Sequence, residues 1–143
     1  MIKKILSLAI SIIASFSIQA KVSDGAYAYS CNYDSEYFGS ILIKSGEATI
    51  EVSTNQIYIV SNVLPRNGAY SLYFKSADLG LGGVDIPFDK LDSSRPLATI
   101  EQQKDSITFE WLGAKDKAGN QVDIPFTALP VAQGTLLLEK CDN

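Results

Sequence analysis

The stretch Ser40-Ile-Leu-Ile-Lys-Ser-Gly-Glu-Ala-Thr-Ile-Glu-Val52 decides the fold of this chain. Two runs rich in β-branched and aliphatic residues, 40–44 and 48–52, flank the turn signal Ser45-Gly46. Runs of this kind on either side of a short turn favour two strands over a helix. The stretch therefore predicts an antiparallel β-hairpin.

The same pattern continues in both directions along the chain. Further strands are predicted at 25–31, 56–60, 69–74, 97–101, 106–112, 121–124 and 135–140. Asn67-Gly68 is a favoured two-residue hairpin turn, and Lys104-Asp105 and Gly119-Asn120 lie at further turn positions. Helix signals are sparse, with one turn predicted at 88–93 before Pro96. Eight or nine short strands at regular spacing predict an all-β, antiparallel barrel or sandwich.

Residues 1–20 read as a secretory signal peptide. Lys3 and Lys4 precede an apolar run from Ile5 to Phe16, and Ala20 stands where a signal peptidase would cut. The run is shorter than the roughly 20 residues that a membrane span needs. We therefore expect a single β-rich domain over 21–143, in the periplasm or secreted, without membrane contact after cleavage.

Two cysteines, Cys31 and Cys141, occur near the ends of the predicted domain. In an oxidising compartment an isolated pair favours a disulfide. The bridge joins the first and last predicted strands, which closure of a sheet places side by side. The chain-entropy model assigns a loop of this size about 4–5 kcal/mol.

Charge and the lack of histidine limit the function. Loss of Lys3 and Lys4 leaves 10 of 12 basic residues against 16 acidic ones, a net charge of −6. This disfavours nucleic acid and anionic membranes and is compatible with a basic partner protein, although solubility alone also explains it. With no histidine, the Ser-His-Asp triad, the Cys-His dyad and nearly all zinc sites are excluded. We expect no metal and no cofactor.

Catalysis is poorly supported by the remaining residues. Paired carboxylates run glycoside hydrolysis, but no spacing singles out a pair from the acidic residues of the second half, Asp85, Asp89, Asp92 and Asp123. The chain is therefore predicted not to be an enzyme.

An internal echo links two parts of the chain. The segment 84–88, Val-Asp-Ile-Pro-Phe, recurs at 122–126, and a leucine follows three residues later in each copy, Leu91 and Leu129. One hypothesis is an ancient duplication that supplies equivalent strands. The other is a strand exit used twice, in which proline ends the pairing and the aliphatic residues pack inward.

Two loop segments are candidate contacts for a partner protein. The first carries tyrosines beside carboxylates, and the second is glycine-rich, which lets a backbone approach another molecule closely. Their residues are Tyr33, Asp34, Glu36 and Tyr37 in the first loop and Asp78, Gly80, Gly82 and Gly83 in the second. A purely structural connection is the alternative for the glycine-rich segment.

The remaining aromatic residues are expected mainly in the core. Tyr27 and Tyr29 share a strand face and are predicted to cap the core with their hydroxyls in water. Trp111 is predicted as a core residue, with ligand stacking as the alternative if one barrel end is open.

The ends of the domain, Tyr29-Ser30-Cys31 and Glu139-Lys140-Cys141, resemble in plan the small periplasmic lysozyme inhibitors. That resemblance implies an antiparallel barrel with a terminal cysteine pair. The Ser-Gly-rich inhibitory loop of that family is absent here, and the segment from Gly80 to Gly83 is a poor substitute for it.

These features together predict a non-catalytic protein-binding domain. Its sharpest form is an inhibitor or immunity protein against a basic, cell-wall-degrading enzyme. One alternative is a carrier of a small apolar ligand inside the barrel, with room left by inward-facing Ala26 and Ala28. The others are an envelope structural subunit and a hydrolase with paired carboxylates.

Overall fold

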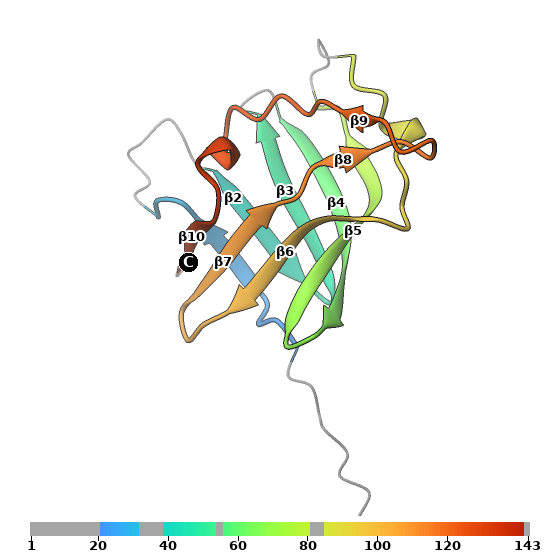
Figure 1. Cartoon of the computed structure of the whole chain (residues 1–143). Helices are drawn as coiled ribbons and strands as arrows, with labels where there is room; N and C mark the ends of the chain where they lie inside the picture. Colours follow the sequence, from blue (N-terminus) through green and yellow to red (C-terminus); the bar gives the residue numbers. More distant parts are fainter. Residues whose placement is uncertain (1–20, 32–38, 54–55, 81–84, 142–143) are drawn as a thin grey trace, which may run out of the picture.

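A computed structural model of the chain describes residues 21–31, 39–53, 56–80 and 85–141 (Figure 1). The predicted signal peptide, residues 1–20, lies outside these ranges. The strands of the described part are β1 (Gly25–Ala28), β2 (Ser40–Lys44), β3 (Glu47–Ser53), β4 (Ile57–Arg66), β5 (Ala69–Asp78), β6 (Pro96–Gln102), β7 (Ser106–Trp111), β8 (Ala114–Lys115), β9 (Gln121–Val122) and β10 (Leu136–Cys141). Two short 3₁₀ helices accompany them, η1 (Phe88–Lys90) and η2 (Val131–Gln133).

Eight of these strands form one closed antiparallel barrel in the order β1-β10-β7-β6-β5-β4-β3-β2. The chain runs up and down around the barrel, and β10 closes it against β1. Strands β8 and β9 form a separate hairpin between β7 and β10. The predicted all-β antiparallel architecture is confirmed, and it is a barrel. Closure leaves no open sheet edge in the barrel.

The hairpin predicted from residues 40–52 is present. Lys44 pairs with Glu47 across the turn, and both turn residues have positive φ, 52° at Ser45 and 81° at Gly46. The Asn67-Gly68 turn repeats this geometry between β4 and β5. Two positive φ values in succession match the right-handed twist of the flanking strands.

Some element boundaries differ from the prediction. Strands β4 and β5 pair from Arg66 and Ala69 as far as Tyr58 and Asp78, well beyond the expected 56–60 and 69–74. The predicted strand 121–124 is shortened to β9, which pairs with β8 outside the barrel. The strand ends before Pro125, because proline cannot donate to a ladder. The predicted helical turn at 88–93 is the 3₁₀ helix η1.

The interior of the barrel is filled by side chains. Tyr27, Phe109 and a set of aliphatic residues are fully buried; the aliphatic residues are Ile41, Ile43, Ile50, Ile57, Ile59, Leu72, Leu97, Ile100, Ile107 and Leu129. The hydroxyl of Tyr27 donates to the carbonyl oxygen of Ser23 at 2.8 Å, so this buried phenol is satisfied.

Tyr27 lies in the core as predicted, but other expectations about β1 are wrong. Tyr29 is exposed, because β1 ends at Ala28, and the hydroxyl of Tyr27 is bonded inside the protein instead of lying in water. Ala26 and Ala28 lie on the strand face opposite to inward-facing Tyr27, and Ala28 is buried on that face. They therefore leave no room inside the barrel.

The predicted disulfide between Cys31 and Cys141 is present, with the two Cα atoms 5.4 Å apart. Cys141 ends β10, whereas Cys31 lies three residues beyond the end of β1. The bridge ties the first and last strands of the barrel together and fits a non-cytoplasmic protein. Within the described ranges, no helix has the length and apolar character needed to cross a membrane.

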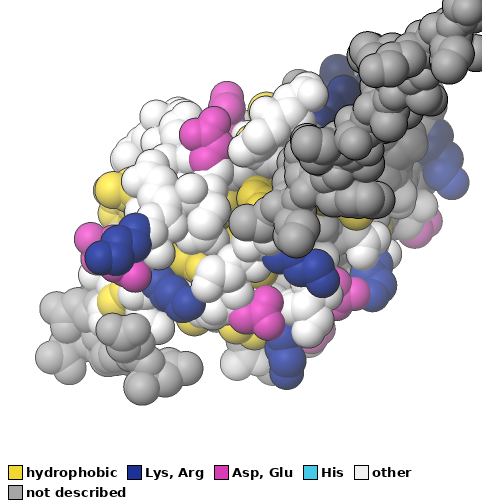
Figure 2. Space-filling model, turned by 90° about the horizontal axis from the view of Figure 1, so that it is seen from below, with side chains coloured by type: hydrophobic (Ala, Val, Ile, Leu, Met, Phe, Trp, Pro, Cys, Tyr) yellow, Lys and Arg dark blue, Asp and Glu magenta, His cyan; other side chains and the backbone are white. Residues whose placement is uncertain are grey.

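The two ends of the barrel differ. Three two- or three-residue turns, at 45–46, 67–68 and 103–105, lie at the lower end in Figure 1, and the longer connections lie at the upper end. Seen from below, the coloured part of the lower end mixes basic and acidic side chains (Figure 2). The connection from β7 to β10 is described throughout, and binding sites are usually built on connections of this kind.

The connection from β7 to β10 crosses the upper mouth of the barrel. It leaves β7 at Trp111 and reaches β3 on the opposite side, where the Thr127 and Ala128 amides donate to the carbonyl oxygen of Val52 at 2.9 and 3.2 Å. We call residues 123–132 of this connection the cap. Gly39, just before β2, lies so close that a Cβ there would stand 2.4 Å from the Ala128 carbonyl oxygen.

Candidate functional site

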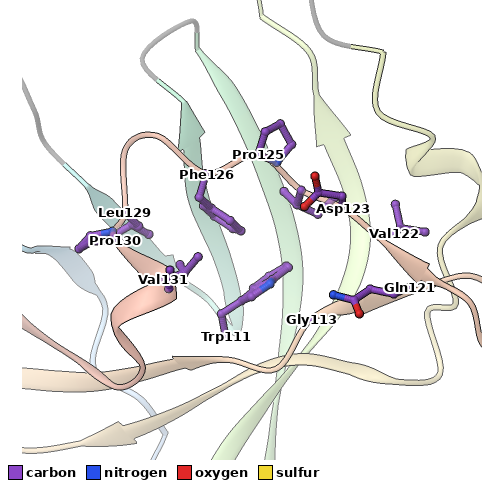
Figure 3. Close-up of a pocket in the computed structure, with 12 residues that line it drawn as sticks. Trp111, Gly113, Gln121, Val122, Asp123, Pro125, Phe126, Leu129, Pro130 and Val131 are labelled. Atoms are coloured by element: carbon purple, nitrogen blue, oxygen red, sulfur yellow. The ribbon is translucent and has the colours of Figure 1, made fainter.

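A groove of about 410 Å³ lies between the end of β7 and the cap (Figure 3). We call it the cap groove. Its lining residues are Trp111, Gly113, Gln121, Val122, Asp123, Ile124, Pro125, Phe126, Leu129, Pro130, Val131 and Ala132. Most of the lining residues are apolar in type, but polar atoms, including backbone groups, make up about as much of the exposed lining as apolar ones.

Trp111 owes its position to the alternation of β7. Ile107 and Phe109 point into the core and are fully buried, and Trp111 has the same phase at the mouth of the barrel. It is therefore only half-buried. The Leu112 amide donates to the Leu97 carbonyl oxygen at 2.8 Å and holds the end of the strand against β6. Trp111 packs against the core as predicted, and its partial burial leaves part of the indole accessible for the alternative of ligand stacking.

Phe126 contacts Trp111 edge to face. The ring centroids lie 4.8 Å apart and the ring planes are inclined by 70°. Figure 3 shows both side chains reaching into the same groove from opposite walls. Arrangements of this kind are worth about 0.5–1.5 kcal/mol beyond burial, so the contact holds the indole in place.

A tight turn around Pro125 aims Phe126. The Phe126 amide donates to the Ile124 carbonyl oxygen at 2.9 Å, the i to i+2 pattern of a γ-turn. Ile124 is anchored in the core, Pro125 is exposed, and the ring of Phe126 is brought back toward β7. A second turn of this type follows at Pro130, where the Val131 amide donates to the Leu129 carbonyl oxygen at 2.9 Å.

The first copy of the echo makes the same turn in another environment. The Phe88 amide donates to the Ile86 carbonyl oxygen at 2.8 Å around Pro87. Phe88, however, is buried and stacks on Phe74 with centroids 6.1 Å apart. Both copies thus share a local turn with a buried isoleucine, and the second copy alone supplies an aromatic wall to the cap groove.

The copies continue differently after these turns. Leu91 and Leu129 are both buried. After Leu91 the chain continues to Pro96, which begins strand β6, whereas after Leu129 it enters the 3₁₀ helix η2 at Val131. Strands β6 and β10, which follow the two copies, both flank β7. An origin by duplication stays a hypothesis.

The β8–β9 hairpin forms the remaining wall. One carboxylate oxygen of Asp116 accepts the amides of Ala118 and Asn120 at 3.0 and 2.8 Å. The backbone hydrogen bond from Asn120 is the main reason that the pKa of Asp116 lies below its ordinary value. This tied turn fixes the start of β9 and thereby Gln121.

Asp123 is the one charged side chain among the described residues that line the cap groove. It is exposed, and the two ion pairs of the described part, Lys75 with Glu47 and Arg95 with Asp92, do not involve it. Figure 3 shows Asp123 and Gln121 on the segment that faces Trp111, with the Gln121 amide directed toward the indole. A free carboxylate therefore stands beside an aromatic surface.

Other perturbed carboxyl groups lie outside the cap groove. Burial raises the pKa of Glu51, whose carboxylate accepts the Ser40 hydroxyl at 3.1 Å. Hydrogen bonds from Ser94 lower the pKa of Asp92, which also pairs with Arg95. In the part of the chain that the structure describes, no three histidine, cysteine or acidic residues are grouped to hold a metal ion.

The predicted partner-binding loops are only partly described. Tyr33, Asp34, Glu36 and Tyr37, together with Gly82 and Gly83, lie outside the described residues. Asp78 ends β5, and its carboxylate accepts the Gly80 amide at 2.9 Å. Neither Asp78 nor Gly80 lines the cap groove.

The cap groove was not predicted as a site, although two signals in the sequence lie in it. The second echo copy, 122–126, supplies one wall, and Trp111 supplies the facing one. The missing information was that one connection crosses the barrel mouth and brings these two segments together.

A second pocket, of about 480 Å³, lies at the lower end of the barrel. Its lining residues are Lys21, Val22, Asp24, Ile43, Ser45, Gly46, Val63, Pro65 and Tyr70. It holds one aromatic side chain, Tyr70, whereas the cap groove holds Trp111 and Phe126 in direct contact. We therefore take the cap groove as the candidate site.

Comparison of the chain with protein-family models, curated proteins and solved structures gave no match.

Proposed function

We propose that this chain is an exported, non-catalytic protein-binding domain that engages its partner through the cap groove. In its sharpest form it is an inhibitor or immunity protein against a basic cell-wall-degrading enzyme. The observation that carries the proposal is the half-buried Trp111 held by Phe126 in an open groove at the end of a filled barrel. Aromatic residues that are fixed before binding make strong anchors at protein interfaces.

The scaffold supports this role energetically. Closure of the barrel, the Cys31–Cys141 bridge and the amide bonds of the cap to Val52 hold the groove in one arrangement. A preorganised surface loses little conformational entropy on binding, so more of the contact energy appears as affinity. The charge of −6 expected for residues 21–143 would speed encounter with a basic enzyme.

The carrier alternative has less support. The space that it needs inside the barrel is occupied by Tyr27 and Phe109, and Ala26 and Ala28 lie on the strand face opposite to Tyr27. The cap groove is open, unlike the enclosed cavity of a small-ligand carrier.

The test is capture of partners from envelope extract under non-reducing conditions, followed by assay of captured peptidoglycan hydrolases for inhibition. Two variants alter the groove. Trp111→Ala removes the aromatic anchor, and Ala132→Gln adds bulk at an exposed lining position. Leu64→Ala is the control, because it removes an exposed leucine near the other end of the barrel. We expect both groove variants to lose the partner and the control to retain it. Capture that is unchanged in both groove variants would overturn the proposal.

A further inference from the structure

The cap groove combines an aromatic surface with a single negative charge. Trp111 and Phe126 form the aromatic part, and Asp123 is the one charged group among its described lining residues. Pro125, Pro130 and Val131 supply apolar walls nearby. A site of this composition favours a ligand that is cationic at one end and apolar along its length.

Long basic side chains have this character. Their methylene stems pack on apolar surfaces while the charged head stays accessible. A cation within about 6 Å of an indole ring centroid is attracted by the ring, and more strongly when the site is partly desolvated. A carboxylate at the same place adds a charge-assisted hydrogen bond.

We propose that the cap groove receives an arginine side chain of the partner protein, between the indole of Trp111 and the carboxylate of Asp123. This inference rests on the proposed function and specifies the chemistry of the partner. Arginine is favoured over lysine because its planar guanidinium both stacks on aromatic rings and pairs with a carboxylate through two parallel bonds. The free carboxylate of Asp123 and the negative charge of the chain both complement such a residue.

The first echo copy provides an internal comparison. Asp85 occupies the place in that copy that Asp123 occupies in the second, and it is also exposed. The aromatic residue that follows it, Phe88, is buried against Phe74, and Asp85 does not line the cap groove. Asp85→Asn therefore removes the same charge from the same motif without changing the proposed site.

The test uses Trp111 as its own reporter, because it is the single tryptophan of the chain. The purified protein is titrated with the peptide acetyl-Gly-Gly-Arg-Gly-Gly-amide, and Trp111 fluorescence is recorded. The matched peptide has citrulline, a neutral analogue of nearly the same shape, in place of arginine. We expect saturable quenching by the arginine peptide and about two- to fivefold weaker binding of the citrulline peptide, because an ion pair with the exposed Asp123 is screened by water.

Two variants test whether Asp123 supplies the negative charge that binds the arginine peptide. Asp123→Asn should reduce affinity for the arginine peptide about two- to fivefold, to the level of the citrulline peptide, and Asp85→Asn should leave it unchanged. Binding should also weaken as salt is raised. Equal binding of both peptides, no effect of Asp123→Asn, or quenching by a chitin oligosaccharide but not by the arginine peptide would each overturn the inference.

These outcomes are separable from failure of the proposed function. If Trp111→Ala abolishes partner capture while Asp123→Asn leaves capture and peptide binding intact, the protein-binding role stands and the arginine inference fails. If the arginine peptide binds through Asp123 while partner capture ignores both groove variants, the arginine site stands and the proposed function fails.

Discussion

Trp111 and Phe126 meet edge to face across the cap groove, with ring centroids 4.8 Å apart. Phe126→Ala should expose the indole, shift its fluorescence emission to longer wavelength and lower the free energy of unfolding by about 1–3 kcal/mol. The barrel should stay folded, because Phe126 lies outside the set of fully buried side chains. Emission spectra and urea unfolding provide the measurement. Phe126→Leu, which keeps an apolar contact, should show a smaller shift, and an unchanged emission in Phe126→Ala would contradict this account.

Gly39 and the cap are in closer contact than any side chain permits. A Cβ at this position would stand 2.4 Å from the Ala128 carbonyl oxygen and 2.5 Å from a methyl carbon of Leu129. Gly39→Ala should therefore push the cap outward and cost about 1–3 kcal/mol, the usual range for overpacking. Thermal unfolding measures the loss, and Trp111 emission reports the displacement.

The control for this prediction lies in the cap itself. Thr127 has an exposed side chain, and only its backbone amide bonds to Val52. Thr127→Ala should change stability by less than about 0.5 kcal/mol. If the Gly39→Ala protein is as stable as Thr127→Ala, the cap moves aside without loss of stability and the prediction is wrong.

The disulfide closes a loop of sequence separation 110. Replacing both Cys31 and Cys141 by serine should lower the free energy of unfolding by about 2–5 kcal/mol, chiefly by freeing the unfolded chain. Urea unfolding measures the change, and the reduced wild-type protein should unfold at the same urea concentration as the double variant. A loss below about 1 kcal/mol would mean that barrel closure by β1 and β10 does not depend on the bridge.

The parts of the fold that could be predicted depend on short-range rules. Two-residue turns at Ser45-Gly46 and Asn67-Gly68 identify hairpins because their positive φ values suit few residues. The bridge between Cys31 and Cys141 could be predicted because there were only two cysteines to pair.

The candidate site depends on long-range contacts that no local pattern encodes. Alternation along β7 predicts the direction of Trp111 but not that it stands at the mouth of the barrel. The echo marks 122–126 as unusual, yet its role depends on the anchoring of the cap to Val52 and on the missing side chain of Gly39. For the same reason the direction of Ala26 and Ala28 depends on which face of β1 packs inward, and it is the Tyr27 face that does so.

The free energy of unfolding should depend on pH through the titration of the Glu51 carboxyl group. Burial raises the pKa of this carboxyl above its ordinary value of 4.5, so the folded state binds the proton more tightly than the unfolded state. The charged form therefore destabilises the fold above the raised pKa, and this penalty disappears as the pH falls below about 4.5. Glu51→Gln should consequently be more stable than wild type at pH 7, and the difference should shrink toward zero at pH 3.5.

Urea midpoints at pH 3.5, 5 and 7 test this expectation. The glutamine oxygen can still accept the Ser40 hydroxyl that now donates to Glu51, so the substitution mainly removes the charge. Glu110→Gln is the matched control, because Glu110 is an exposed residue of β7. A stability difference for Glu51→Gln that stays constant across the three pH values would assign the effect to packing, because only a titrating carboxyl makes the difference follow the proton.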